Sequence, residues 1–243
     1  QKNPVGIDIL NPRLNWQLNS DQRNVKQSAF QIQVAEGDKK FENPIWDTGK
    51  VESDQSIQVK YEGPELNSQT RYYYRVKVWD QDNQESEWSP VNYWEMGILN
   101  PDEWQADWIA ADDENQDQSE AVSPFFRKEF DLKGNEAIDK ARIYVTSLGL
   151  YELELNGSKV GDWVFTPGWT SYNKRLQYQT YEVKDMLKNG QNALGAKLGK
   201  GWYRGELAWE GQTDIYGDKL ALLCQLHITY KNGEEEIITS DTG

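Results

Sequence analysis

The chain has 243 residues, which is enough for one large domain or two modest ones. Its 40 acidic and 26 basic side chains give a net charge of −14, which argues against a nucleic-acid ligand and against docking on an anionic membrane surface. Aromatic residues form 12% of the chain, which argues against disorder. The apolar runs are too short to insert into a membrane.

The first hundred residues show the period-two alternation of half-buried strands. It occurs at 30–35, where Phe, Ile and Val alternate with Gln and Ala, and again at 57–61 and 72–79. Gly, Pro, Asn and Asp separate these runs at 36–38, 62–64 and 80–83. Several short strands at this spacing predict an antiparallel β-sandwich.

A break in the pattern follows at Leu99-Asn100-Pro101-Asp102. We therefore expect two domains, 1–98 and 99–243, with an acidic, polar loop at 112–123 early in the second. The second half again predicts strands, at 151–155 and 222–230. Each is followed by an Asn-Gly pair, the strongest short-range hairpin signal. One short helix is expected over 183–189, ended by Gly190. The predicted fold class is all-β, with two tandem antiparallel β-sandwiches.

Two segments resemble metal- or phosphate-binding motifs, but each lacks residues that the motif requires. Asp113, Asn115 and Asp117 have the spacing of a calcium-binding EF-hand loop, but Gln118 and Pro124 stand where the turn glycine and the bidentate Glu are needed. The run 195–201 imitates a phosphate loop, but its spacing is one residue short and Gly replaces the Ser or Thr that binds magnesium. We expect a solvated loop in the first case and a strand end and turn in the second.

The single Cys and single His are also poor candidates for chemistry. Cys224 falls on the apolar face of its strand, where it acts as a small hydrophobe, and one cysteine excludes an internal disulfide framework. His227 falls on the polar face, where an exposed or hydrogen-bonded imidazole is expected. With 40 carboxylates, the sequence singles out no acid pair for glycoside hydrolysis, and no residue is predicted to be catalytic.

Aromatic residues cluster in two segments of the second half, 161–172 and 199–205. Sugar sites combine flat aromatic faces with side chains that bond hydroxyl groups. The candidate carbohydrate-binding residues are therefore Asp162, Trp169, Trp202, Tyr203 and Arg204. The alternative is that these aromatic rings fill a sandwich core or a domain interface.

Several of these motifs carry a family resemblance. The stretches at 46–51, 71–80 and 86–89 (Ser-Glu-Trp-Ser) resemble the fibronectin-type-III-like module that opens bacterial α-L-rhamnosidases. Five stretches downstream resemble the jelly-roll module that follows in those enzymes. They are Leu155-Asn156-Gly157, Val160-Gly161-Asp162, Thr166-Pro167-Gly168-Trp169-Thr170, Gly201-Trp202-Tyr203-Arg204-Gly205 and Tyr216-Gly217-Asp218.

The resemblance implies a parent enzyme that releases terminal L-rhamnose with inversion, using an acidic pair in an (α/α)₆ barrel. These 243 residues lack the long helical pattern of that barrel, so we expect this portion to be inactive alone. Its expected role is structural support of the barrel, together with binding of rhamnosides. The expected partners are the barrel of the same polypeptide and rhamnose-containing glycans. The resemblance also suggests that residues 240–243 stop before the jelly roll is complete. An acidic, aromatic-rich polysaccharide-degrading protein is usually exported, so we expect an extracytoplasmic protein, in the periplasm or secreted, although a single unpaired Cys suits the cytoplasm equally well.

Some relatives of the jelly-roll module bind rhamnose through a calcium ion held partly by an Asp-Asn pair. Asp162 matches the Asp, but Trp163 follows it here, so no metal site is predicted and calcium stays an open alternative. Two other functions also stay open. One is a carbohydrate-binding module with its own affinity for rhamnose, and the other is a protein-adhesion tandem unrelated to sugars.

Overall fold

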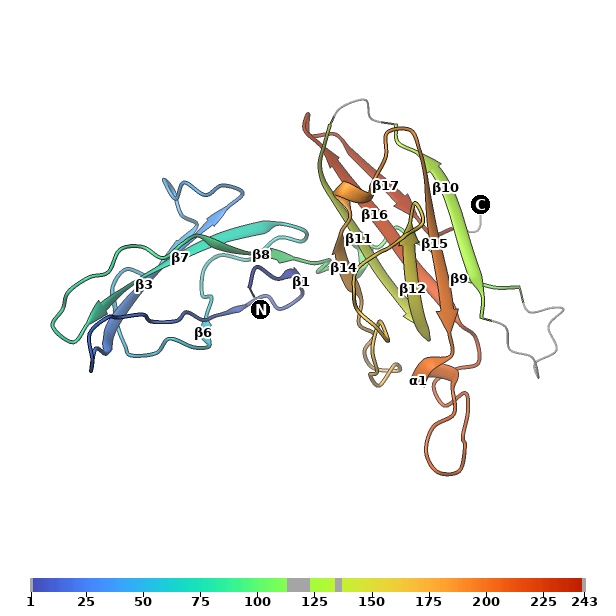
Figure 1. Cartoon of the computed structure of the whole chain (residues 1–243), viewed down its shortest axis with the longest axis horizontal. Helices are drawn as coiled ribbons and strands as arrows, with labels where there is room; N and C mark the ends of the chain where they lie inside the picture. Colours follow the sequence, from blue (N-terminus) through green and yellow to red (C-terminus); the bar gives the residue numbers. More distant parts are fainter. Residues whose placement is uncertain (1, 113–122, 134–136, 242–243) are drawn as a thin grey trace. The chain divides into compact units, whose positions relative to one another are not determined.

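The computed structural model describes residues 2–112, 123–133 and 137–241. The chain divides into two compact units, Gln1–Glu103 and Trp104–Gly243, so the division falls slightly after the predicted boundary at residue 98. Both units consist of β-sheets (Figure 1). The helical elements of the described residues are single turns, namely η1 (Pro101–Glu103), η2 (Lys184–Met186) and α1 (Gly201–Arg204).

The first unit contains a six-stranded and a two-stranded sheet. The six-stranded sheet has the order β1-β8-β7-β3-β4, with β5 also paired to β3, and β2 pairs with β6 in the small sheet. All these pairings are antiparallel except β1 with β8, which is parallel. The strands are β1 (Val5–Ile7), β2 (Arg13–Leu14), β3 (Gln27–Glu36), β4 (Trp46–Asp47), β5 (Val51–Glu52), β6 (Val59–Lys60), β7 (Arg71–Asp80) and β8 (Asn92–Met96).

An aromatic cluster forms the core of the first unit. Trp94 is 5.5 Å from the stacked ring of Tyr72, and the rings of Tyr61 and Tyr74 lie 5.9 and 5.8 Å away. The alternation predicted for 30–35 is confirmed, because the apolar side chains of β3 are buried. The strand predicted over 57–61 is only two residues long, since Gln58 has a positive φ of 57° and Ile57 turns outward.

The Ser-Glu-Trp-Ser motif lies along an edge of β7, where the Ser86 and Ser89 amides donate to the Val78 and Val76 carbonyls. The Ser89 hydroxyl accepts a hydrogen bond from the Val76 amide at 3.0 Å, which ties the motif to the strand. The Trp88 ring then lies under two cations, with the Arg75 guanidinium 4.4 Å and the Lys77 ammonium 5.1 Å from its centre. These cation–π contacts suit a partly exposed Trp because they cover its apolar face.

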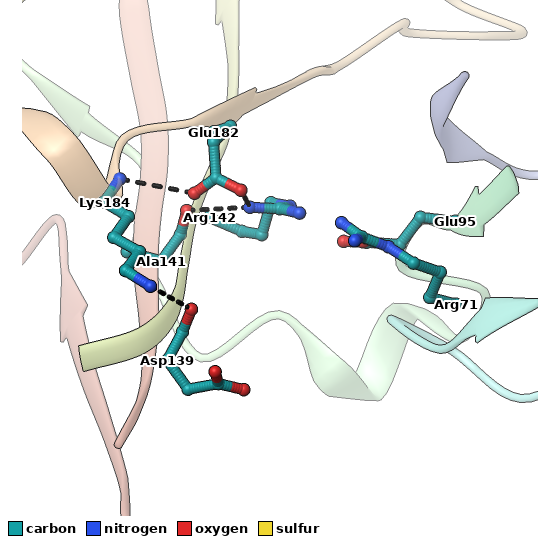
Figure 2. Close-up of polar contacts among 7 residues, drawn as sticks. All are labelled: Arg71, Glu95, Asp139, Ala141, Arg142, Glu182 and Lys184. Atoms are coloured by element: carbon teal, nitrogen blue, oxygen red, sulfur yellow. Dashed lines mark hydrogen bonds and ion pairs between the residues drawn. The ribbon is translucent and has the colours of Figure 1, made fainter. Parts of the chain in front are cut away.

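A buried carboxylate links β7 to β8. Glu95 is fully buried, and Arg71 donates to its Oε2 from Nε at 3.0 Å and from Nη2 at 2.8 Å (Figure 2). Burial works to lower the pKa of Arg71, but Glu95 and Tyr73 together outweigh burial and the pKa is raised. Arg71 is therefore charged at neutral pH, and the buried Glu95 side chain compensates its charge.

The second unit is a sandwich of two sheets (Figure 1). One sheet has the order β10-β15-β12-β13, and the other has the order β14-β11-β16-β17, with β9 also paired to β16. All pairings are antiparallel. The strands are β9 (Ile109–Ala110), β10 (Phe125–Asp131), β11 (Ile138–Leu148), β12 (Leu150–Leu155), β13 (Ser158–Lys159), β14 (Gln179–Glu182), β15 (Gln191–Gly199), β16 (Ala221–Tyr230) and β17 (Glu235–Thr239).

The predicted alternation is confirmed in β12, and the predicted apolar positions of β16 face the core. In β12 the side chains of Tyr151, Leu153 and Leu155 are buried between the sheets, and the apolar positions of 222–230 meet them from β16. The Asn156-Gly157 turn joins β12 to β13 with φ values of 55° and 79°, as the hairpin signal requires.

One expectation for β16 is wrong in part. Gln225 lies on the face predicted to be polar, yet it is fully buried and its Oε1 accepts a hydrogen bond from the Gln105 amide at 2.9 Å. The segment that opens the second unit covers this face, since the Trp104 ring packs on Tyr178 at 5.4 Å. His227 packs edge-on against Tyr144, with ring centres 5.2 Å apart, and is half-buried.

The helix predicted over 183–189 is also wrong. Only the single turn η2 forms, and Leu187 returns to extended backbone with φ −80° and ψ 144°. The segment is short, and Val183 is buried in the sandwich core. The side chain of Asn192 then binds the chain that follows, accepting from the Lys188 amide at 2.9 Å. Packing and this side-chain bond replace the second helical turn that the sequence pattern suggested.

A buried arginine joins β11 to β14. Arg142 is 1% exposed, and its Nη1 donates to the Glu182 carboxylate and to the Ala141 carbonyl at 3.2 Å (Figure 2). Lys184 fixes the same carboxylate through its backbone amide, 3.3 Å from Oε1, and its Nζ reaches the Asp139 carbonyl at 2.9 Å. The network therefore holds the end of β14 against β11.

Cys224 gives the first testable expectation. Burial between the sheets raises the pKa of its thiol to about 12 from 9.0. Since the thiolate is the reactive form, a thiol reagent at pH 8 should modify the folded chain about 1,000-fold more slowly than the urea-unfolded chain. The same shift makes folding less favourable as pH rises from 9 to 12, because only the unfolded thiol ionises there. Equal labelling rates in the folded and unfolded states would contradict this burial.

Candidate functional site

Two long connections meet at one end of the second sandwich, the end where Figure 1 shows α1. One joins β13 to β14 over 160–178, and the other joins β15 to β16 over 200–220. Trp169 of the first connection stacks on Trp202 of the second, with ring centres 5.9 Å apart and planes 5° from parallel. Trp169 Nε1 also donates to the Tyr216 hydroxyl at 3.3 Å. We call the paired connections the aromatic end.

Three tyrosines form the base of the aromatic end. Tyr172 packs on Tyr203 at 5.2 Å and on Tyr216 at 5.0 Å, and its hydroxyl donates to the Gly168 carbonyl at 3.1 Å. Tyr203 is 8% exposed, and burial raises the pKa of both Tyr172 and Tyr203, so both stay neutral at physiological pH. Gly217 passes so close that an added Cβ would lie 2.1 Å from the Tyr203 hydroxyl. Tyr203 thus supports the loops from beneath.

The charged group predicted for sugar contact is already paired. Arg204 Nε donates to Asp214 Oδ1 at 2.9 Å, and the Asp214 amide returns a bond to the Arg204 carbonyl at 3.2 Å. The pair closes the base of the 204–214 loop. An ion pair this close to solvent adds little free energy, but it fixes the direction of the guanidinium.

Asp162 takes a different position from the other candidates. It is exposed and acts electrostatically on Tyr181, whose pKa is raised mainly by burial and further by the Asp162 charge. Tyr181 in turn lies 3.1 Å, hydroxyl to hydroxyl, from Tyr151. Contacts therefore join Trp169 and Trp202 directly, and link them to Tyr203 through Tyr172 and Tyr216. Arg204 instead pairs with Asp214, and Asp162 lies beside the Tyr151–Tyr181 pair.

Sequence reasoning missed how apolar the aromatic end is. The Phe165 ring meets Trp202 edge-on at 5.9 Å although 64% of the residue is exposed. Trp209 is fully exposed. The large apolar side chains exposed on the two connections are Trp163, Val164, Phe165, Trp169, Trp209 and Ile215. A signal was available, because apolar residues recur in both segments without the period of a strand or helix.

The described residues contain no group of three or more His, Cys, Asp or Glu side chains placed to hold a metal ion. The EF-hand-like residues Asp113, Asn115 and Asp117 lie outside the described residues. The phosphate-loop imitation at 195–201 is the end of β15 followed by the turn α1, as predicted. No described helix is long and apolar enough to cross a membrane.

Two family models match the chain, and each covers one unit. Residues 1–100 match "Rha78A-like, N-terminal immunoglobulin domain", and residues 136–243 match "Alpha-L-rhamnosidase N-terminal domain". The first description is immunoglobulin-like where the sequence suggested fibronectin type III, and both are β-sandwiches. The fold and the two matches define a tandem of N-terminal β-modules of the glycoside hydrolase type.

Relatives and solved structures identify the enzyme class. An α-L-rhamnosidase of Formosa agariphila is 37% identical over 99% of this chain, and one of Alteromonas sp. is 35% identical over 98%. The α-L-rhamnosidase structures from Streptomyces avermitilis, in complex with L-rhamnose, and from Dictyoglumus thermophilum superpose with TM-scores of 0.92 and 0.87, at 26% and 35% identity, each over 99% of this chain. The chain belongs to the α-L-rhamnosidases as an N-terminal region. It spans 27% of the length of each of the two curated relatives, and 39% and 28% of the two solved chains.

Proposed function

We propose that these residues support the catalytic part of a longer polypeptide that releases terminal L-rhamnose with inversion. The acidic pair of that reaction lies in a helical barrel outside the 243 residues, and the aromatic end is the surface that the catalytic part covers. The same polypeptide acts on rhamnose-containing glycans and is extracytoplasmic. A chromogenic α-L-rhamnoside should therefore be hydrolysed by the complete gene product and not by the 243-residue chain.

One observation favours support over sugar binding at the aromatic end. Arg204 is bound to Asp214, and Tyr203 is buried. Two of the polar side chains predicted for sugar contact are thus paired or covered, whereas apolar rings stay exposed. Exposed apolar clusters on a folded protein mark interaction surfaces, and Trp residues dominate the binding energy of such surfaces. An apolar protein surface therefore complements the aromatic end better than a sugar does.

Binding of a rhamnoside is the second candidate, carried by the flat, 56% exposed residue Trp169 stacked on Trp202. Hydrogen exchange of 161–172 separates the two functions. Support predicts at least tenfold slower exchange in the complete gene product than in the 243-residue chain, and no further change with millimolar L-rhamnose, with or without calcium. Slowing by the sugar in the 243-residue chain, without slowing by the rest of the polypeptide, would favour sugar binding instead.

Substitution gives an independent test of the same surface. Replacing Trp169 and Trp209 together with alanine should lower the thermal midpoint of the complete gene product by several degrees, because interface tryptophans contribute about 2 kcal/mol or more each. In the 243-residue chain, where both side chains are exposed, the shift should be small. Ile57→Ala removes a similarly exposed side chain of the first unit and is the control. Equal shifts in both proteins would contradict docking at the aromatic end.

A further inference from the structure

An apolar slot opens between the two sheets of the second unit. Its volume is about 170 Å³, and its walls include Phe126 of β10, Leu194 of β15, Cys224 of β16 and Ile238 of β17. Protein interiors pack at the density of organic crystals and leave few voids larger than a water molecule. A slot this large between two well-formed sheets therefore calls for a covering group.

Two strand edges flank the slot. Among the described residues, β10 pairs only with β15, and β17 only with β16. The Ser240 amide donates to the Cys224 carbonyl at 2.7 Å, so the alternation of an antiparallel pair turns the Ile237 and Thr239 amides away from β16. The Leu198 amide donates to the Pro124 carbonyl at 3.0 Å, and the same alternation turns the Glu129 amide outward from β10.

The chemistry of the two edges differs. The edge of β10 carries Arg127, Lys128 and Glu129, and Lys128 Nζ lies 2.5 Å from Asp241 Oδ2 across the slot. Charged residues, Lys above all, are the usual means of blocking an edge strand from pairing. The edge of β17 ends in Ile237, Ile238 and Thr239, which are uncharged, β-branched and strongly strand-forming. Only β17 is therefore open to another strand.

We propose that the outer edge of β17 pairs with a β-strand from the part of the polypeptide that lies outside these 243 residues. The inward side chains of that strand are apolar and fill the slot beside Cys224 and Ile238. The inference shares one assumption with the proposed function, namely that the polypeptide is longer than 243 residues. The relatives support this assumption, because this chain spans only 27% of the length of each. The slot and the aromatic end are separate surfaces with no lining residue in common.

Hydrogen exchange of the complete gene product, resolved to single amides, tests the pairing without any substitution. We expect the Ile237 and Thr239 amides to exchange as slowly as those at the centre of β16, and at least 100-fold more slowly than in the 243-residue chain. The outward amide of Glu129 in β10 is the internal control and should exchange fast in both. Fast exchange at Ile237 and Thr239 in the complete gene product would overturn the proposal.

A proline pair tests it by substitution. Proline removes an outward N–H and is tolerated at a strand edge only where that N–H faces solvent. Thr239→Pro should lower the thermal midpoint of the complete gene product at least twice as much as Glu129→Pro, while in the 243-residue chain the two shifts should be similar. Equal shifts in the complete gene product would count against an added strand.

The outcomes also separate this proposal from the proposed function and from another occupant. In the complete gene product, slow exchange at 161–172 with fast exchange at Ile237 and Thr239 would rule out the added strand and support docking of the aromatic end. Fast exchange at 161–172 with slow exchange at Ile237 and Thr239 would support the added strand and rule out that docking. If sedimentation shows that the complete gene product is dimeric, and dilution to monomer restores fast exchange at Thr239, then a second copy rather than the same polypeptide covers the edge, and the proposal is wrong.

Discussion

Replacing Gly149 with alanine is expected to destabilise the second unit by about 4 kcal/mol. Gly149 joins β11 to β12 with a φ of +121°, a conformation that side-chain-bearing residues rarely adopt. An added Cβ would lie 2.5 Å from the Gly199 carbonyl oxygen and 2.9 Å from Leu220 Cδ2. Backbone strain and overpacking each cost about 1 to 3 kcal/mol, and here neither neighbour can move freely.

Gly157→Ala is the matched control. Gly157 also has a positive φ, +79°, but nothing lies within 4 Å of its added Cβ, so only the backbone term of about 1 to 2 kcal/mol remains. Urea unfolding of both variants, with hydrogen exchange in β12 and β15 to locate the effect, gives the comparison. A Gly149→Ala variant no less stable than Gly157→Ala would show that the β11–β12 junction is looser than described.

Removing the Glu95 carboxylate should cost the first unit about 3 kcal/mol. Deleting one member of a buried ion pair leaves the other charge without compensation, at a typical cost of about 3 to 5 kcal/mol. The lower figure applies because the Arg71 side chain is 31% exposed and regains some water. Glu95→Ala, measured by urea denaturation, tests this expectation.

The exposed pair Lys50–Glu52, 3.0 Å apart, is the control for that effect. Glu52→Ala should change the free energy of unfolding by about 0.5 kcal/mol or less, because water screens both partners. If Glu95→Ala were equally mild, the Glu95 carboxylate would not be charged in the folded protein.

Much of the fold followed from the sequence because its signals are local. Burial alternates strictly along β12 and over 30–34 of β3, and Asn156-Gly157 forms its turn from its own backbone preferences. The errors arose where distant chain decided the outcome. Gln225 is polar and still buried, because Gln105, far away in sequence, covers it. The predicted helix over 183–189 gave way because Val183 is drawn into a core built by strands that the local pattern does not include.

The candidate site was predictable in composition but not in arrangement. Aromatic clustering pointed to Trp169 and Trp202, and the two rings do stack. No local rule indicates that Arg204 is held by Asp214 or that Tyr203 lies beneath the loops, since both facts depend on how 200–220 folds back on itself. Asp162 is close to Trp169 in sequence, yet Gly161, with its φ of +71°, directs the chain so that Asp162 lies beside Tyr181.

The pairing of β11 with β16 has a consequence for synthesis on the ribosome. Leu148 pairs with Ala221 and Ile138 with Tyr230, so this pairing cannot form until residues 149–220 and β16 have been translated. At the usual elongation speed this delay is roughly 5 to 15 s, which is long compared with the microseconds in which a hairpin such as β12–β13 closes. Throughout that interval the apolar side chains of Ile143 and Val145 in the unpaired β11 remain exposed to water. The nascent chain is therefore most prone to aggregation in the interval before β16 emerges.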